Sequence, residues 1–275
     1  MAHATSLKTP SLDAHLEALR SEDAAAGVKA AKALARLGPR AAAALDALLD
    51  RLDDDDKTVG RWVASALGAL GPVAVPALCR VLSDGPERTR ARAAAALQAM
   101  GPAGAPAVGG LIRLLEDPDA ETRQSALGAL GAMGEAAAPA VSALARTLES
   151  STSAERQAAI RALERIGPQA TGALPALVRT LRSPEVDLLT RCAAAQAMGA
   201  VSAGSTAAAA ALAEALEDPA EDLRWYAAIA LKLLGASARS ALPALRSAAE
   251  GSDESLRVQA REAISAITGA PAAQA

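Results

Sequence analysis

A sequence pattern that returns about every 33 residues constrains the fold of this chain more than any other feature. Its clearest copy is RQSALGALGAMG, from Arg123 to Gly134. Related copies begin at Gly27, Gly60, Arg90, Arg123, Arg156, Arg191, Arg224 and Arg257, so the steps between them are 33, 30, 33, 33, 35, 33 and 33 residues. A period of this length is typical of a repeat array, in which each unit packs mainly on its neighbours.

Aligned by their first residues, the copies have the spacing of a helix with one buried face. The fourth, seventh, eighth and eleventh positions are apolar, and this spacing places them on one side of a helix. The seventh position is Ala in every copy, namely Ala33, Ala66, Ala96, Ala129, Ala162, Ala197, Ala230 and Ala263. The eighth and eleventh positions hold larger residues, such as Leu97 with Met100. The alanines predict a close approach between helices, and the larger side chains fill the space around it.

A second helix is predicted between successive copies, for example at PALCRVL (Pro76–Leu82) and PALVRTL (Pro175–Leu181). Aromatic residues make up only 1% of the chain, which suits helices better than strands. We therefore predict an all-α chain, an α-solenoid of about eight two-helix repeats. The repeats span approximately 9–38, 39–71, 72–101, 102–134, 135–167, 168–202, 203–235 and 236–269. Residues 9–269 are expected to form a single domain, with flexible tails at 1–8 and 270–275.

Turn signals support these boundaries. Between repeats, pairs such as Gly38-Pro39 and Gly71-Pro72 predict that Gly ends one helix and Pro opens the next. Within repeats, Asp117-Pro118 and Asp218-Pro219 predict an N-cap followed by a first-turn proline. The fifth position of the pattern is apolar in seven copies but is Arg261 in the last. We expect the eighth repeat to be a polar cap on the array.

The stretches PALVRTLRSPEVDLLTRCAAAQAMG and EDPDAETRQSALGALGAMG resemble the HEAT family, in particular the short HEAT-like repeats also found in phycobiliprotein lyases. The resemblance covers nearly the whole chain. It implies a right-handed superhelix in which the pattern-bearing inner helices line the concave side and the outer helices form the convex side. It also implies a ladder of acidic residue–Arg pairs between repeats. The ladder arginines would be Arg90, Arg123, Arg156, Arg191, Arg224 and Arg257, whereas Gly27 and Gly60 depart from the motif.

Exposed positions of the inner helices form a candidate protein-binding groove. Its residues are Trp62, Arg92, Ser125, Arg161, Glu164, Gln196, Trp225 and Tyr226. All aromatic residues of the chain, two Trp and one Tyr, belong to this set. A groove with aromatic anchors suits an extended or helical segment of another protein. The alternative is that Trp62 and Tyr226 merely cover the ends of the core.

A second candidate surface is a row of arginines on four successive outer helices. Its members are Arg80, Arg113, Arg146 and Arg179. Such a stripe could contact a phosphate backbone or an acidic partner. However, Arg80 with Asp84 and Arg113 with Asp117 are opposite charges four residues apart, and aromatic residues for base stacking are missing. These features favour a solvated helix face, and nucleic acid is the less favoured ligand.

The residues predict no catalytic, cofactor or metal site. His3 and His15 are the only histidines, so neither a His-rich metal site nor the His-Glu pairs of di-iron HEAT-repeat hydroxylases can be assembled. Cys79 and Cys192 have no histidine partner and are interpreted as buried free thiols in a reducing compartment. The acidic run 53–56 lacks the ligand spacing of a calcium loop. We therefore expect a protein that is not an enzyme.

Charge and hydropathy give the remaining expectations. The net charge of −3 provides no general attraction to nucleic acid or to anionic membranes. No signal-peptide core is seen near the N-terminus, and the longest uncharged stretch, Cys192–Ala213, straddles a repeat boundary. We expect a cytoplasmic protein, monomeric and not membrane-bound. The favoured function is a scaffold or adaptor that binds a protein segment in the concave groove. Two alternatives stay open: a phycobilin-lyase-like factor acting on a phycobiliprotein, and nucleic-acid binding on the arginine stripe.

Overall fold

The computed structural model describes residues 11–150, 152–202 and 204–269, and every regular element in these ranges is a helix. Outer helices are α1 (Leu12–Arg20), α3 (Leu45–Asp50), α5 (Val75–Asp84), α7 (Val108–Leu114), α9 (Val141–Ser150), α11 (Leu174–Arg182), α13 (Thr206–Ala215) and α15 (Leu242–Glu250). Inner helices are α2 (Ala24–Leu37), α4 (Lys57–Leu70), α6 (Glu87–Met100), α8 (Ala120–Met133), α10 (Ser153–Ile166), α12 (Leu188–Val201), α14 (Glu221–Leu234) and α16 (Glu254–Thr268). The predicted all-α chain of eight two-helix repeats is confirmed. The expected tails at 1–8 and 270–275 lie outside the described residues.

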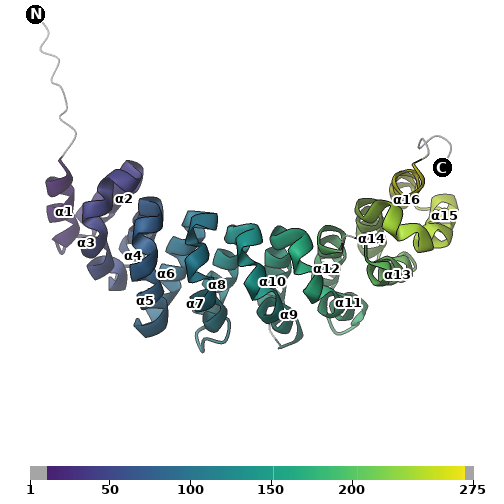
Figure 1. Cartoon of the computed structure of the whole chain (residues 1–275), viewed down its shortest axis with the longest axis horizontal. Helices are drawn as coiled ribbons and strands as arrows, with labels where there is room; N and C mark the ends of the chain where they lie inside the picture. Colours follow the sequence, from purple (N-terminus) through teal and green to yellow (C-terminus); the bar gives the residue numbers. More distant parts are fainter. Residues whose placement is uncertain (1–10, 151, 203, 270–275) are drawn as a thin grey trace, which may run out of the picture. The chain divides into compact units, whose positions relative to one another are not determined.

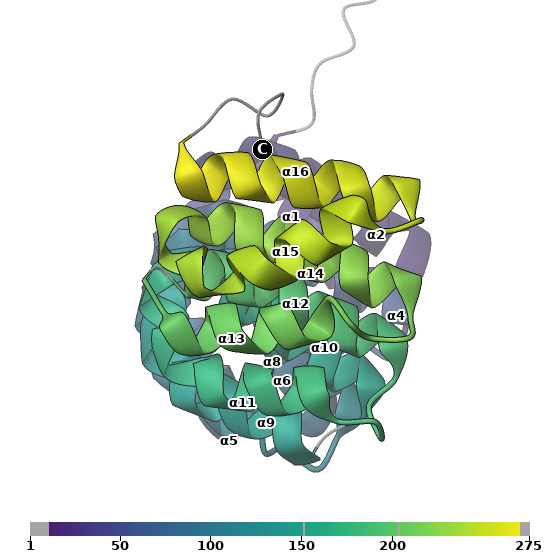
Figure 2. The same cartoon turned by 90° about the vertical axis from the view of Figure 1, so that its right-hand side faces the viewer.

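Contacts group the chain into two compact units, one up to Ala129 and one from Leu130 onward. In the first unit the outer helices α3, α5 and α7 lie along one side of the inner helices α4 and α6 (Figure 1). In the second unit α9, α11 and α13 lie in the same way beside α10, α12 and α14. Figure 2 shows α12, α14 and α16 as successive layers, and these neighbours pack directly on one another. Each unit is therefore a stack of helix pairs.

The core lies where the sequence columns place it. All eight residues at the fourth and at the eighth positions of the pattern are buried, and so are the alanines at the seventh position apart from half-buried Ala33. Helices approach closely here: a Cβ added at Gly68 would lie 2.8 Å from the carbonyl oxygen of Ala96. In the second unit, a Cβ added at Gly199 would lie 3.1 Å from Cα of Ala230. Small residues are thus required because neighbouring backbones leave no room for larger ones.

The fifth position of the pattern changes character in the last repeat, as predicted. It is buried in the first seven copies, whereas Arg261 on α16 is exposed. Nearby, the Nζ atom of Lys232 on α14 lies 2.8 Å from an Oε atom of Glu262. This face of α16 is therefore polar and exposed in the described part of the chain.

Glycine turns separate the repeats as predicted. Gly38 and Gly71 end α2 and α4 with φ angles of 57° and 73°, which other residues rarely adopt, and a proline opens the following 3-10 turn. The predicted N-caps at Asp117 and Asp218 are wrong, since α8 and α14 begin only at Ala120 and Glu221. Asp117 and Asp218 instead accept hydrogen bonds from backbone N–H groups two residues later.

Three helical runs are long and apolar enough to cross a membrane by length and composition alone: Lys57–Asp84, Ala120–Glu149 and Glu221–Glu250. Each run consists of an inner helix of 14 residues and the next outer helix of 9 or 10 residues, separated at a glycine of positive φ. A membrane-spanning helix needs about 20 continuous residues. No single straight segment of these runs reaches that length. The uncharged stretch Cys192–Ala213 is likewise divided between α12 and α13.

Candidate functional site

The ladder arginines are structural, as the sequence motif implies. The guanidinium of Arg90 donates to both carboxylate oxygens of Asp117 in the next repeat, at 2.8 and 3.1 Å. Equivalent pairs in the second unit are Arg156–Asp187 at 3.9 Å, Arg191–Asp218 at 2.5 Å and Arg224–Asp253 at 3.3 Å. Because carboxylates compensate these four arginines, they do not form a free anion-binding surface.

Two ladder arginines also bind a carbonyl group in the turn inside their own repeat. Nη1 of Arg123 donates to the carbonyl oxygen of Asp117 at 2.7 Å, and Nη1 of Arg224 donates to that of Asp218 at 2.9 Å. In both cases the carbonyl belongs to the residue six positions before the arginine. A repeat with Gly at the ladder position has no side chain that could donate to this carbonyl group.

In the repeat that has Gly60, Arg92 supplies the donor for this carbonyl group. A Cβ added at Gly60 would lie 2.1 Å from Cζ of Arg92, so the guanidinium occupies the space of the missing side chain. Nη1 of Arg92 donates to the carbonyl oxygens of Leu52 and Asp54, both at 2.7 Å. Asp54 lies six residues before Gly60, the same relation as in the ladder repeats. Arg92 is therefore half-buried and engaged rather than a freely exposed groove residue.

In the first repeat, Arg51 supplies the donor for the corresponding carbonyl group. Its Nη1 atom donates at 2.8 Å to the carbonyl oxygen of Ser21, which lies six residues before Gly27. Its Nη2 atom lies 3.3 Å from the position of a Cβ at Gly27 and 2.6 Å from an Oδ atom of Asp54. Both departures from the ladder motif are thus compensated by an arginine of the following repeat.

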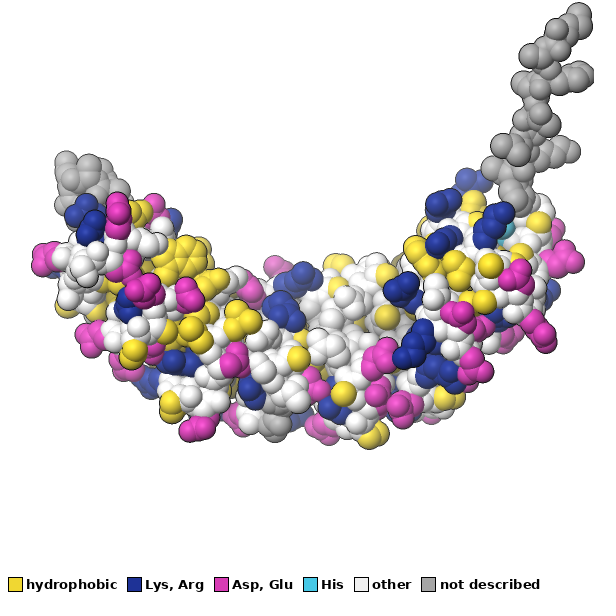
Figure 3. Space-filling model, turned by 180° about the vertical axis from the view of Figure 1, so that it is seen from behind, with side chains coloured by type: hydrophobic (Ala, Val, Ile, Leu, Met, Phe, Trp, Pro, Cys, Tyr) yellow, Lys and Arg dark blue, Asp and Glu magenta, His cyan; other side chains and the backbone are white. Residues whose placement is uncertain are grey.

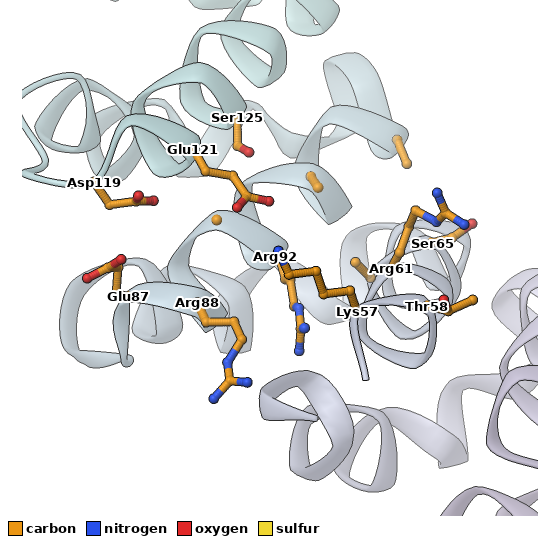
Figure 4. A pocket seen from close by; sticks show the side chains of 14 residues that line it. Lys57, Thr58, Arg61, Ser65, Glu87, Arg88, Arg92, Asp119, Glu121 and Ser125 are labelled. Atoms are coloured by element: carbon orange, nitrogen blue, oxygen red, sulfur yellow. The ribbon is translucent and has the colours of Figure 1, made fainter. Parts of the chain in front are cut away.

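A hollow of about 620 Å³ opens on the inner helices α4, α6 and α8 of the first unit. Its base is built from small residues, among them Ala64, Ala91, Ala95 and Ala99. Charged side chains surround this base (Figure 4). The charged lining residues are Lys57, Arg61, Arg88 and Arg92 with Glu87, Asp119 and Glu121. The volume falls within the range of about 300–1,000 Å³ that is usual for ligand sites.

Three of these charged groups are held by the protein itself. Arg88 contacts the carboxylates of Asp53 at 3.3 Å and Asp55 at 2.7 Å. The carboxylate of Asp119 accepts from the backbone N–H and the hydroxyl of Thr122, both at 2.7 Å, and the hydroxyl bond is the main cause of its lowered pKa. Burial, and secondarily the nearby Arg88, lowers the pKa of Arg92 below its usual range. These groups form a frame around the hollow whose charges are engaged within the protein.

Four charged groups of the lining have no ion pair within the described part of the chain. They are Lys57 and Arg61 on α4, Glu87 on α6 and Glu121 on α8. All four side chains belong to exposed residues. The hollow therefore has unpaired cations on one helix and unpaired carboxylates on the other two.

The predicted groove residues of the first unit fall at two places. Arg92 and Ser125 line the hollow. Trp62 lies elsewhere, in a smaller hollow of about 350 Å³ with Lys32, Ala35 and Arg36. The Nζ atom of Lys32 lies 4.6 Å from the centre of the Trp62 ring, a cation–π contact that covers the half-buried indole. Trp62 is therefore half-buried in a hollow separate from the one that Arg92 and Ser125 line.

The remaining groove residues belong to the second unit. Nε2 of Gln196 on α12 donates to Glu164 on α10 at 2.7 Å, while Arg161 on α10 is exposed. Trp225 and Tyr226, both half-buried at the start of α14, meet edge to face with their ring centres 5.0 Å apart. These residues lie on the inner helices, and the hydrogen bond between Gln196 and Glu164 joins two successive repeats.

The arginine stripe is exposed on α5, α7, α9 and α11, but its expected partners are wrong. Asp117 pairs with Arg90 and not with Arg113, which donates to the hydroxyl of Ser83 at 3.0 Å. No ion pair joins Arg80 to Asp84 within the described residues. In the second unit Arg179 pairs with Glu149. The face drawn in Figure 3 also shows Lys and Arg interspersed with Asp and Glu.

The thiols are poor nucleophiles. Burial raises the pKa of Cys192 to about 11, and burial also raises the pKa of half-buried Cys79. The thiolate is the reactive form of cysteine, so neither group is activated near neutral pH. Within the described ranges, no cluster of three or more His, Cys, Asp or Glu residues could hold a metal ion.

The unpaired charges of the hollow were missed by sequence reasoning. The columns were counted from the ladder position, but α4, α6 and α8 each begin three residues earlier. Residues of this first turn, such as Lys57, Glu87 and Glu121, therefore lay outside the alignment. The signal that could have found them is the helical spacing itself, because residues three or four apart share a face.

Two solved structures with TM-scores above 0.5 support the fold, and a third is similar with a lower score. A crystal structure of a Kap121p mutant matches with a TM-score of 0.67 and 13% identity, over 93% of this chain and 33% of that chain. An engineered protein matches with a TM-score of 0.57 and 22% identity, over 96% and 80%. The complex of CpcE and CpcF of phycocyanin lyase from Nostoc sp. PCC7120 matches at 27% identity over 98% of both chains, with a TM-score of 0.47.

Sequence comparison gives the family. No curated protein matches the sequence significantly. A family model for HEAT repeats matches residues 12–98, 75–163 and 141–232. These ranges overlap and together extend over most of the chain, and the ladder arginines and stacked helix pairs agree with them. The chain belongs to the HEAT repeat family.

Proposed function

We propose that this chain is a non-catalytic scaffold or adaptor that binds a segment of another protein on the surface of its inner helices. The observation that carries the proposal is the hollow of about 620 Å³ on α4, α6 and α8, with four unpaired charged side chains around an alanine base. Repeat proteins commonly use the surface of their stacked helices to bind partners. The hollow is the binding site that we assign to that surface.

The frame of the hollow is suited to binding because three of its charged side chains already have partners within the protein. Arg92 is tied to two carbonyl oxygens, Arg88 to two carboxylates and Asp119 to the first turn of α8. Binding sites on helices held by such secondary contacts lose little conformational entropy when a ligand enters. The raised pKa values of both thiols support a role without covalent catalysis.

The test uses two alanine-to-tryptophan variants of the purified, tagged chain. Ala95 is exposed on α6 and lines the hollow, so Ala95→Trp fills it without entering the core. Ala210 is exposed on the outer helix α13, and Ala210→Trp is the matched control. Nuclease-treated lysate is passed over each variant, and bound proteins are identified by mass spectrometry. We expect a specific protein that is retained by the wild-type chain and the control but lost with Ala95→Trp.

The same eluates distinguish the alternative functions. A partner retained equally by all three chains would move the binding site away from the hollow. A bilin absorption band together with phycobiliprotein subunits would favour the lyase-like alternative. Nucleic acid that is bound when nuclease is omitted, and lost after Arg113→Glu, would favour the arginine stripe.

A further inference from the structure

We infer that the hollow recognises a protein segment with charges of both signs, placing an acidic side chain against Lys57 and Arg61 and a basic side chain against Glu87 and Glu121. This inference rests on the proposed function and specifies its partner. The four side chains are exposed, line one hollow and have no ion pair within the described residues. Unpaired charges facing a shared hollow favour a ligand of complementary charge.

The separation of the charges follows from the helices that carry them. Lys57 and Arg61 lie four residues apart on α4, so they share one face of that helix. Glu87 and Glu121 stand near the beginnings of α6 and α8, on the other side of the hollow from Arg61 in Figure 4. A ligand with charges of only one sign would meet attraction on one side and repulsion on the other.

The remaining charges around the hollow are compensated within the protein, with the exception of Arg92. Arg88 is neutralised by Asp53 and Asp55, and Asp119 is used to hold the first turn of α8. Arg92 keeps its positive charge beside α4, because a guanidinium whose pKa is lowered by burial stays protonated near neutral pH. It therefore adds to the cationic side formed by Lys57 and Arg61.

The base of the hollow indicates a polypeptide rather than a compact ligand. Ala95 and Ala99 are exposed one helical turn apart on α6, with no side chain longer than a methyl group. Small residues let the backbone of a partner approach closely while its longer side chains reach the charged groups. No aromatic side chain lines this hollow, so flat ring systems would find no stacking partner.

The inference is tested with fluorescein-labelled synthetic peptides on one Ala/Gln background. The peptides carry an acidic block followed by a basic block, the same blocks reversed, an acidic block alone, a basic block alone, or no charge. Binding to the purified full chain is measured by fluorescence anisotropy at about 50 mM and about 500 mM salt. We expect one of the two-block peptides to bind at least about tenfold more tightly than the single-sign and neutral peptides, with weaker binding at high salt.

Charge-reversed variants assign the two sides of the hollow. Arg61→Glu should weaken the two-block peptide about tenfold, and Arg61→Glu with Glu121→Arg should favour the reversed block order. Both positions are exposed, and thermal unfolding checks that the variants are folded. The inference is overturned if a single-sign peptide binds as tightly as the two-block peptides, if the double variant leaves the block preference unchanged, or if no peptide binds below about 1 mM. A partner that is lost with Ala95→Trp would still leave the proposed function standing in each of these cases.

Discussion

Because Arg92 takes the place of a ladder arginine, we expect the effects of substitutions at residues 60 and 92 on stability to depend on each other. Arg92→Ala removes the donor for the carbonyl oxygens of Leu52 and Asp54. Hydrogen bonds from charged donors are worth about 1.5–3 kcal/mol each, and water can replace part of this at a half-buried site. We therefore expect a loss of about 1.5–3 kcal/mol in the free energy of unfolding for the two bonds together.

Gly60→Arg alone should also destabilise the protein. A Cβ at residue 60 would lie 2.1 Å from Cζ of Arg92, so the existing guanidinium must leave its place. Overpacking of this kind costs about 1–3 kcal/mol, and removing a glycine from a helix returns about 0.8–1 kcal/mol. The expected net loss is about 0–2 kcal/mol.

The double variant Gly60→Arg with Arg92→Ala should be more stable than Arg92→Ala alone. It recreates the arrangement of Arg123, whose Nη1 atom donates to a carbonyl oxygen six residues earlier in its own repeat. Arg92→Ala removes the clash with the new side chain at residue 60, and Gly60→Arg restores a donor for the carbonyl group. We expect a coupling energy of about 2–3 kcal/mol, at the upper end of values for residues in contact.

Urea denaturation followed by far-UV circular dichroism measures these differences, with the slope of the transition checked because repeat arrays can unfold in more than two states. Arg61→Ala is the control on the same helix, since Arg61 is exposed and unpaired, and it should change stability by less than about 0.5 kcal/mol. If the effects of Gly60→Arg and Arg92→Ala simply add, Arg92 does not replace a ladder arginine.

Three further predictions concern acid stability, thiol reactivity and packing. Hydrogen bonds, first from Ser153 and then from Thr190, lower the pKa of Asp187 in the folded state, so its stabilising contribution is complete above the unfolded pKa of about 3.9 and is lost as the pH falls below it. Thermal melts between neutral pH and strong acid should show a smaller acid-dependent loss for Asp187→Asn than for the wild type. Iodoacetamide at pH 8 should label Cys192 only after urea unfolds the chain, because its folded pKa is about 11; fast labelling of the native protein would contradict its burial. Ala230→Leu should lower the free energy of unfolding by about 1–3 kcal/mol, because Ala230 lies against Gly199, whereas no loss would mean that α12 and α14 are not in close contact.

Much of the fold could be predicted from periodicity, because burial follows from which residues share a helix face. The column that is Ala in every copy predicts the close approach that is observed at Gly199 and Ala230. The role of Arg92 could not be predicted in this way. Its position marks it as exposed, and only the empty space above Gly60 and the carbonyl groups of another repeat bring it into the interior.

The candidate site was less predictable than the fold for a related reason. Arg92 and Ser125 both line the hollow, but Arg92 is half-buried rather than exposed. Arg61 and Glu121 were not recognised, because a charged residue on a helix surface has no sequence signal that separates a paired side chain from an unpaired one. Asp117 illustrates the same difficulty, since its expected pair with Arg113 is replaced by a pair with Arg90.

The position of Arg92 also decides how freely repeats can be exchanged. Arg123 and Arg224 are encoded in the same repeats as the carbonyl groups that they bind, so each of these turns would keep its donor if its repeat were moved or duplicated. The second repeat depends on a donor encoded in the third, and the first depends on Arg51 of the second. Excision of residues 72–101 would therefore leave an uncapped turn in a repeat whose own sequence had not been altered. The first three repeats must be inherited, or engineered, as one block.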